Sequence, residues 1–431
     1  MKFDDNIDFL STFIKRFVHK ATNEKVVIEK TLMALIAGTI LLQRASPNSI
    51  WHDLLTCDGA STFYHDIHNL AIGMPTLYVD AFKAVQKDGR LRMRSNGILV
   101  IDEHLIEHTS KNIDGAASYF SPSENKYITA VSILTMHYWH GTIEYPVAFR
   151  IYRRLKELQA KKQEKDYKKK NNIVREMLHE LSALKGMPVT LVFDSAFMTK
   201  ETVLILKGMG KNYISRPKRP WKVSYKHKKY SIEELFESIP INEFGKVEVK
   251  NPKTHKTKKQ MVAVRDAYIP RIGMHRIVFI DCTKEKRCEN EKEAAETCTA
   301  PSGRKFRVFL TNVLTWDAAK ILATYSVRWT IETSYRDMNQ CLSLGGCKWR
   351  ELSAQYFFIA TTFLCYLFLA WVRVHGFLAG YNSELETIGQ LKEAFSRYCQ
   401  YQHVLWWIET RQQSESDPVE KWIINRVYAS A

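Results

Sequence analysis

The sequence predicts an α/β fold with a helical N-terminal domain and a β-rich insertion. Residues 1–95 show helical spacing of apolar residues, whereas short apolar runs typical of buried strands alternate with helical segments from residue 96 onward. Residues 219–310 contain short strands of alternating pattern joined by lysine-rich links. The 431 residues, 45% of them hydrophobic, suffice for two or three domains. We expect a helical N-terminal domain (1–95), a first core segment (96–218), the insertion (219–310), a second core segment (311–400) and a C-terminal tail (401–431).

The N-terminal helices are predicted from an apolar run and a helix start signal. Residues 32–42, LMALIAGTILL, are too short to cross a bilayer and are typical of a core helix. Ser46 can cap a following helix, and Pro47 suits its first turn. Five cations follow between residues 83 and 94, where a solvated face and a phosphate-contacting surface remain equally good interpretations.

The core elements follow from changes in hydrophobic period. GILVIDEH (97–104) predicts a buried strand that ends in acids, and residues 126–141 and 144–154 predict a hairpin. A long charged helix is expected over about 153–185, followed by a buried strand in MPVTLVFDSAF (187–197). The remaining predicted elements are a helix at 199–210, strands at 212–216, 246–250, 261–269, 275–281 and 306–312, and the helix that carries residues 325–340.

Two of these strands place an aspartate at their carboxyl ends, Asp102 after ILVI and Asp194 after TLVF. Sites of open α/β sheets tend to lie at that edge, and a hard divalent cation with substrate phosphate would relieve the repulsion between crowded carboxylates. The alternative is a turn or helix cap, which is common for an aspartate at this position. Asp281 follows a similar apolar run but lies in the β-rich segment, so we interpret it as structural.

The stretch YSVRWTIETSYRDMNQ (325–340) concentrates polar groups on one predicted helix. Tyr325, Arg328, Glu332 and Asn339 lie at i, i+3, i+7 and i+14, which keeps them on one side of a 3.6-residue helix. The alternative is a solvated helix face, because Arg328 and Arg336 each lie four residues from Glu332 and could form ion pairs with it along the helix. Such pairs stabilise a helix by only about 0.2–0.5 kcal/mol. Tyr325 favours a site over a charged surface, because its side chain can stack or donate a hydrogen bond.

The overall charge narrows the class of partner. A formal net charge of +17 favours an anionic partner, either nucleic acid or an acidic membrane surface. Residues 352–372 carry no charge over 21 positions, near the roughly 20 needed to cross a bilayer. Polar residues dilute the first half of this run and no second span exists, so we expect a buried core helix and no membrane.

Compartment and metal content are suggested by the N-terminus and the cysteines. The opening MKFDDNIDFL lacks the basic and apolar regions of a signal peptide, so we expect a cytoplasmic protein. The eight cysteines form no CxxC pair, which favours reduced thiols. Cys282, Cys288 and Cys298 cluster loosely and leave a zinc site as a minor alternative.

The stretch 325–340, together with the two strand-terminal aspartates, resembles the DDE transposases of bacterial and archaeal insertion sequences, of the insertion-sequence-four type. Tyr325, Arg328 and Glu332 match the family signature Y-(2)-R-(3)-E-(6)-K, whose lysine is replaced here by Asn339. Asp102 corresponds to the first catalytic aspartate of that family. Residues 194–197, DSAF, are similar to its second aspartate motif, and residues 215–218, SRPK, to its basic R-x-K.

The resemblance implies an RNase H-like catalytic core, here interrupted by the β-rich insertion. It implies that Asp102, Asp194 and Glu332 bind two magnesium or manganese ions and promote strand cleavage at transposon ends and strand transfer into target DNA. It further implies a prokaryotic, nucleoid-associated enzyme that works as a dimer on paired terminal inverted repeats. The alternative is a catalytically inactive, transposase-derived DNA-binding protein, to which Asn339 gives weight. The implied DNA contacts are Tyr325, Arg328, Arg216, Lys218 and Asn339.

Overall fold

The computed structural model describes most of the chain. The described ranges are 8–18, 26–42, 46–54, 60–110, 112–121, 125–182, 189–218, 221–283, 297–381 and 385–411. Residues 412–431, which make up most of the predicted C-terminal tail, and Cys288 of the cysteine cluster lie outside these ranges.

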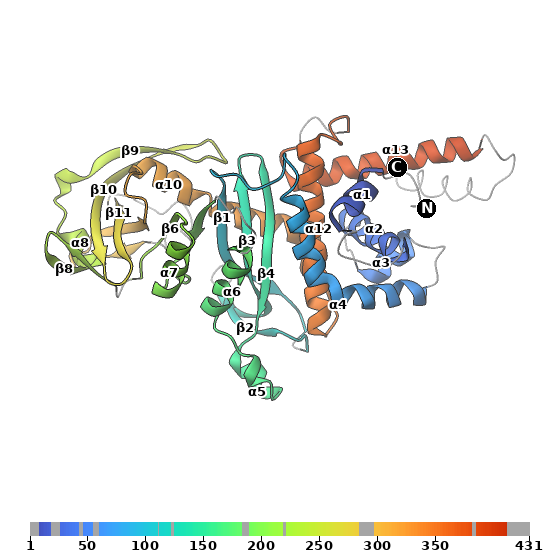
Figure 1. Ribbon diagram of the computed structural model, residues 1–431, viewed down its shortest axis with the longest axis horizontal. Helices are drawn as coiled ribbons and strands as arrows, with labels where there is room; N and C mark the ends of the chain where they lie inside the picture. The colour runs from blue at the N-terminus through green and yellow to red at the C-terminus, as the bar shows by residue number, and fades with distance from the viewer. Residues whose placement is uncertain are drawn as a thin grey trace.

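A mixed sheet of 13 strands forms the centre of the molecule and extends into its β-rich end (Figure 1). Three strands run parallel side by side: β1 (Ile98–Glu107), β5 (Thr190–Phe193) and β6 (Tyr213–Ser215). On the other side of β1, β3 (Lys126–His140) pairs antiparallel, and β4 (Ile143–Tyr152) and β2 (Ala116–Ser121) pair with β3. The predicted α/β class and the predicted β3–β4 hairpin are confirmed.

Strand β1 is longer than the sequence suggested. We predicted that it ends in acids at residues 102–104, but it continues to Glu107 because β3 pairs with it along its whole length. Its parallel pairing with β5 stops at Ile101. Asp102 therefore lies within a strand, at the point where the parallel part of the sheet ends.

The β-rich segment joins the same sheet. Strand β13 (Lys305–Thr311) pairs antiparallel with β6 on one side and with β11 (Gly273–Asp281) on the other. Strand β10 (Thr257–Ile269) pairs with β11 and with β9 (Gly245–Lys250). The predicted strands in this region are therefore confirmed. Also present are β7 (Lys222–Tyr225), β8 (Lys228–Ser231), α8 (Ile232–Glu237), the 3-10 turn Ile241–Glu243 and β12 (Cys298–Thr299).

The predicted long helix over 153–185 is wrong. The chain forms α5 (Leu155–Ala160), a 3-10 turn (Glu164–Asp166) and α6 (Lys170–Ser182), and Lys162 between them adopts a left-handed φ of 55°. Most helical stability in proteins comes from packing an apolar face, and apart from Tyr167 the segment 161–170 has no large apolar side chain to bury. The predicted helix after β5 is confirmed as α7 (Lys200–Gly208).

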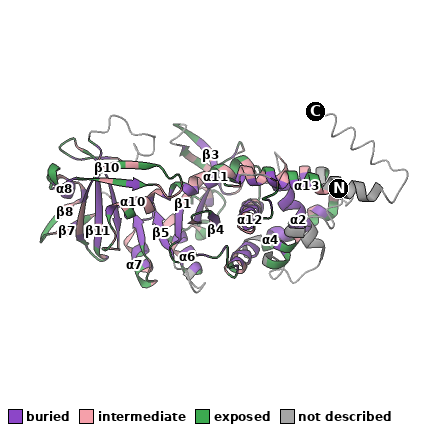
Figure 2. Cartoon of the chain, turned by 90° about the horizontal axis from the view of Figure 1, so that it is seen from above, coloured by how far each residue is buried: buried purple, intermediate pink, exposed green. Residues whose placement is uncertain are grey.

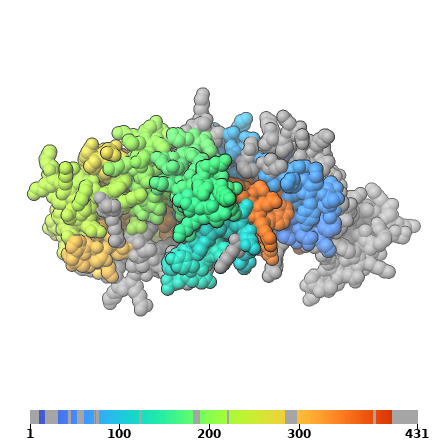
Figure 3. Space-filling model, turned by 90° about the horizontal axis from the view of Figure 1, so that it is seen from below, coloured from blue at the N-terminus to red at the C-terminus, as the bar shows by residue number. Residues whose placement is uncertain are grey.

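Helices cover the opposite end of the molecule. The long helix α12 (Leu352–His375) lies between the sheet and the N-terminal helices (Figures 1 and 2). In the described chain it alone is long and apolar enough to cross a membrane, and 83% of its most apolar window is buried inside the protein, so the predicted core helix is confirmed. In Figure 3 its residues, in orange, are enclosed between the core and the N-terminal helices. These N-terminal elements are α1 (Asp8–Phe13), a π-helical turn (Ile14–Val18), α2 (Val26–Leu41), α3 (Pro47–Leu54) and α4 (Ala60–Val85).

Details of the N-terminal helices agree with the sequence signals. Residues 31–40 of α2 are buried, and the N–H of Ser49 donates to Ser46 Oγ at 3.1 Å at the start of α3. Within the cationic run, Arg90 donates to the carbonyl of Val374 at 3.4 Å, and the phosphate interpretation stays a prediction. At the other end of the chain, α13 (Ile388–Arg411) crosses the predicted boundary at residue 400.

Candidate active site

Asp102 and Asp194 lie at neighbouring positions on the sheet. Ile101 of β1 pairs with Phe193 of β5 in parallel register, so the next residue on each strand is one of the two aspartates. Neighbouring strands lie about 4.8 Å apart, which brings both side chains to the same edge. Asp102 Oδ1 accepts the N–H of Glu103 at 2.9 Å, and Asp194 Oδ1 accepts the N–H of Ser195 at 2.6 Å.

The third carboxylate comes from a helix that packs against β1. Helices α10 (Ala318–Ser326) and α11 (Trp329–Cys341) together carry the polar stripe, and Glu332 lies in the first turn of α11. We predicted one helix with a polar face, but the chain breaks between the two helices at Val327 and Arg328. Tyr325 and Arg328 are only 6% and 7% exposed, so this part of the stripe faces the protein, whereas Asn339 at its end is exposed.

Arg328 connects two of the three carboxylates. Its Nη1 lies 3.0 Å from Asp102 Oδ2 and 3.3 Å from Glu332 Oε1. The predicted i,i+4 pair with Glu332 therefore exists, and the contact to Asp102 spans 226 residues of sequence. One guanidinium nitrogen thus neutralises carboxylates from β1 and α11, where the sequence suggested a contact to DNA.

The electrostatics confirm that the three carboxylates influence one another. Burial raises the pKa of Asp102 from 3.8 to about 6, although the Arg328 guanidinium and the N–H of Glu103 lower it. Glu332 and Asp194 raise it further, because each adds negative charge close by. Ionised Asp102 is therefore costly in this position unless positive charge compensates it.

A second layer of side chains surrounds Asp102. The ring of Tyr335 on α11 stacks on His104 with centroids 4.1 Å apart, and its hydroxyl bonds to Thr135 Oγ1. Asn339, an exposed residue one turn further on, places Nδ2 3.3 Å from His104 Nε2. His104 is therefore part of the packing between β1 and α11.

The two basic residues after β6 take different positions. Arg216 Nη1 lies 3.9 Å from Asp194 Oδ1, so Arg216 lies beside the second aspartate. Lys218 lies two residues further, where its carbonyl accepts the N–H of Trp221, and it takes no part in the ion pairs of the described chain.

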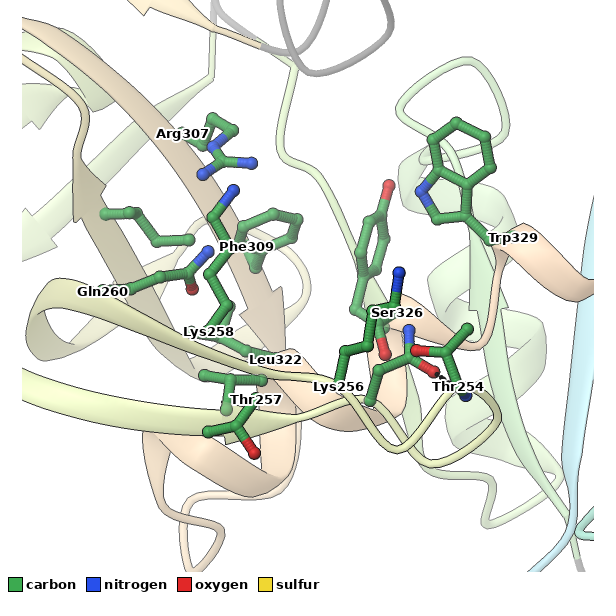
Figure 4. A pocket seen from close by; sticks show the side chains of 14 residues that line it. Thr254, Lys256, Thr257, Lys258, Gln260, Arg307, Phe309, Leu322, Ser326 and Trp329 are labelled. Atoms are coloured by element: carbon green, nitrogen blue, oxygen red, sulfur yellow. Dashed lines mark hydrogen bonds between the residues drawn. The ribbon is translucent and has the colours of Figure 1, made fainter. Parts of the chain in front are cut away.

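A cavity of about 390 Å³ lies between the β9–β10 hairpin and the α10–α11 junction (Figure 4). Tyr325 belongs to its wall and packs on Phe309 at a centroid distance of 4.6 Å. Trp329, at the start of α11, is 39% exposed and lines the cavity. Sequence reasoning missed this cavity, because Lys256, Lys258 and Arg307 come from a segment without a recognisable motif.

Asp281 takes no part in this arrangement. Its Oδ2 lies 3.0 Å from Arg304 Nη2, and its Oδ1 accepts the N–H of Thr283 at 2.9 Å. These partners account for the carboxylate, in agreement with a structural role.

The donor chemistry of the site suits a hard divalent cation. Carboxylate oxygens are the ligands that magnesium prefers, and one or two of them usually suffice alongside water and substrate phosphate. The described residues contain no group of three histidine, cysteine, aspartate or glutamate side chains that could hold a metal ion, and Arg328 contacts both Asp102 and Glu332. The carboxylate oxygens are therefore the right type of ligand for such an ion, and the Arg328 guanidinium supplies the positive charge beside them.

Comparison with known protein families agrees with this geometry. Residues 163–368 match the family model of the transposase DDE domain. The match includes Asp194 and Glu332, whereas Asp102 lies before its start. It supports a transposase function, which implies a nuclease or transferase activity and a DNA substrate. No curated protein matches the chain.

Proposed function

We propose that this protein is a DNA transposase of the insertion-sequence-four type. In this proposal it cleaves strands at transposon ends and transfers the freed 3′-hydroxyl into target DNA by a cut-and-paste route. The observation that supports the proposal is the arrangement of the carboxylates. Asp102 and Asp194 follow the paired residues Ile101 and Phe193 of β1 and β5, and Arg328 contacts both Asp102 and Glu332 of α11.

The strand order supports an RNase H-like core for this activity. The order β4-β3-β1-β5-β6, with β1, β5 and β6 parallel and β3 antiparallel to β1, is the arrangement expected of such a core. The segment from β7 to β13 then counts as the insertion, between the second aspartate and the glutamate.

The chemistry assigns a role to each charged side chain. Asp102, Asp194 and Glu332 would hold magnesium or manganese, two ions in our proposal. Bound in pairs, such ions activate an attacking oxygen and stabilise a leaving oxygen in phosphodiester displacement. Arg216 and Arg328 lie beside these carboxylates and would contact the phosphates of the bound end, with Tyr325, Lys218 and Asn339 further along the strand.

The biological setting follows from the substrate. We propose that the protein works in the prokaryotic cytoplasm, at the nucleoid, as a homodimer that pairs two terminal inverted repeats. A catalytically inactive, DNA-binding descendant of a transposase is the second candidate, and the replacement of the family lysine by Asn339 favours it.

Cleavage of DNA that carries the terminal inverted repeats, with magnesium or manganese present, tests the proposal. Glu332→Gln should lower the cleavage rate by at least about a hundredfold, since transition-state charge stabilisation by bound metal contributes several kcal/mol. Glu393→Gln, an exposed glutamate paired with Arg397 on α13, is the matched control and should cleave like the wild type. Unchanged cleavage by folded Glu332→Gln would remove the assignment, and specific binding without cleavage by the wild type would favour the inactive descendant.

A further inference from the structure

An ion pair between half-buried Lys253 and buried Glu144 joins the β-rich segment to the core. Lys253 Nζ lies 2.8 Å from Glu144 Oε2, and Glu144, on β4, is only 6% exposed. Lys253 belongs to the turn between β9 and β10, so this pair connects the tip of a hairpin to a strand of the core. In Figure 1 β9 runs from the β-rich end of the molecule toward β1.

The turn holds Lys253 in a defined position. Asn251 Oδ1 accepts the N–H of Lys253 and the N–H of Thr254, each at 2.9 Å. The N–H of Asn251 donates to the carbonyl of Lys256, and the N–H of His255 donates to the carbonyl of Asn251. The backbone of the tip is therefore closed on itself, and its lysine is directed to the core.

A chain of buried hydrogen bonds leads from Glu144 to the helix that carries Glu332. Tyr366 Oη on α12 donates to Glu144 Oε1 at 3.4 Å and lies 3.3 Å from Ser334 Oγ. Ser334 Oγ also lies 3.0 Å from His137 Nε2 and donates to the carbonyl of Thr330 at 2.9 Å. Ser334 follows Glu332 by two residues on α11, so the chain ends on the catalytic helix.

The docked hairpin also closes the cavity beside the site. Asn251, Thr254, Lys256 and Thr257 of the hairpin line the cavity together with Tyr325, Ser326 and Trp329 of the α10–α11 junction (Figure 4). Release of the hairpin tip from Glu144 would therefore have two effects: it would open the side of the cavity that the hairpin lines, and it would remove one support of α11.

We propose that Lys253 is a positioning residue, which docks the β9–β10 hairpin onto the core and holds α11 through Glu144, Tyr366 and Ser334. Its consequence for catalysis rests on the proposed transposase function, whereas its consequence for docking does not. The burial of Glu144 explains why a lysine is needed there, since an unpaired buried carboxylate is strongly destabilising.

Amide hydrogen exchange without DNA tests the docking. Lys253→Met combined with Glu144→Gln removes both charges, so this double variant stays folded while the tip loses its anchor. Protection of residues 251–257 should fall about tenfold or more, because the tip loses the contact that holds it to the core, and protection of α11 should fall with it. Lys259→Met on the same hairpin, whose exposed lysine pairs with Glu248, is the control and should leave both segments unchanged. Unchanged protection of the tip or of α11 in the double variant would overturn the proposal.

Cleavage kinetics separate positioning from a direct contact to DNA. The double variant should lose about tenfold or more in kcat with KM little changed, because misplacement of a catalytic group by about 1 Å costs up to a hundredfold. Lys253→Arg, which keeps the charge, should recover most of this loss. A raised KM with a flatter salt dependence and intact protection would make Lys253 a phosphate contact and overturn its positioning role. Absence of cleavage by the wild type would refute the proposed function alone, and the exchange result would still decide the docking.

Discussion

Asparagine in place of Asp102 should stabilise the metal-free protein at neutral pH. The pKa of Asp102 is 3.8 in an unfolded chain and about 6 in the folded protein, where burial, Glu332 and Asp194 disfavour its charge. The folded state therefore binds the proton more tightly than the unfolded state, and the wild type loses stability as the pH rises from about 4 to about 6. At about 1.36 kcal/mol per pKa unit, the full loss is about 3 kcal/mol.

Urea unfolding of the wild type and Asp102→Asn in a chelator, at several pH values, measures this term. Asparagine has no charge to lose, so the difference in unfolding free energy between variant and wild type should increase by about 2 kcal/mol from pH 4.5 to pH 7.5 and level off above pH 7. The loss of the ion pair with Arg328 adds a nearly constant offset and leaves this slope intact. Asp114→Asn, at an exposed carboxylate paired with Lys161, is the control for carboxylate removal.

The magnesium dependence gives the same measurement a second use. If Asp102 contributes to an ion site, magnesium at a hundredfold its dissociation constant should stabilise the wild type by about 2.7 kcal/mol and Asp102→Asn by less. If the difference in unfolding free energy between Asp102→Asn and the wild type, measured in a chelator, stays constant or decreases as the pH rises, the reasoning is refuted. Asp102 would then not be a desolvated carboxylate beside two others.

Three further substitutions test other parts of the site. Arg328→Ala should lower the unfolding free energy by about 3–5 kcal/mol in a chelator, because it leaves the largely buried carboxylates of Asp102 and Glu332 without their counter-charge. A urea titration that shows a loss of less than about 1 kcal/mol would contradict this. Gly97→Ala should lower the thermal midpoint at a cost of about 1–3 kcal/mol, because its Cβ would lie 2.4 Å from the buried ring of Tyr138; an unchanged midpoint would show that the ring can move. Asn339→Lys should steepen the dependence of log DNA affinity on log salt by about 0.9, because it adds one phosphate contact. The unfolding free energy should change by less than about 0.5 kcal/mol, since Asn339 is exposed. An unchanged salt dependence would place residue 339 away from phosphate.

Apolar runs predicted the central strands well because burial on both faces leaves a distinct sequence pattern. The runs before Asp102 and Asp194 became β1 and β5, and the uncharged segment 352–372 became the buried α12. The break between α5 and α6 was missed because lysine, glutamate and glutamine all favour helix locally. Only the tertiary structure shows that this stretch packs no apolar face.

The site was partly predictable for a similar reason. Residue type and spacing predicted Glu332 and Arg328 as site residues, and the strand pattern predicted Asp102 and Asp194; the structure brings Arg328 into contact with Glu332 and Asp102. The contact between Arg328 and Asp102 depends on how α11 packs on β1, which no local pattern in the sequence encodes. The same holds for Lys253, whose partner Glu144 lies 109 residues away in a strand that looked merely apolar.

The position of Arg328 also limits what it can do at one time. A guanidinium nitrogen shared by Asp102 and Glu332 acts as an internal counter-charge, and its contact to a DNA phosphate would require it to leave at least one of them. Removal of Asp102 and removal of Arg328 should therefore have opposite effects on stability at neutral pH, although each deletes one partner of the same ion pair. The carboxylate is the group whose ionisation is costly, and the guanidinium is the group that reduces this cost. A surface ion pair would give small changes in unfolding free energy for both removals. Changes of opposite sign would therefore identify a desolvated site, in which Arg328 compensates the carboxylates until a bound cation replaces it.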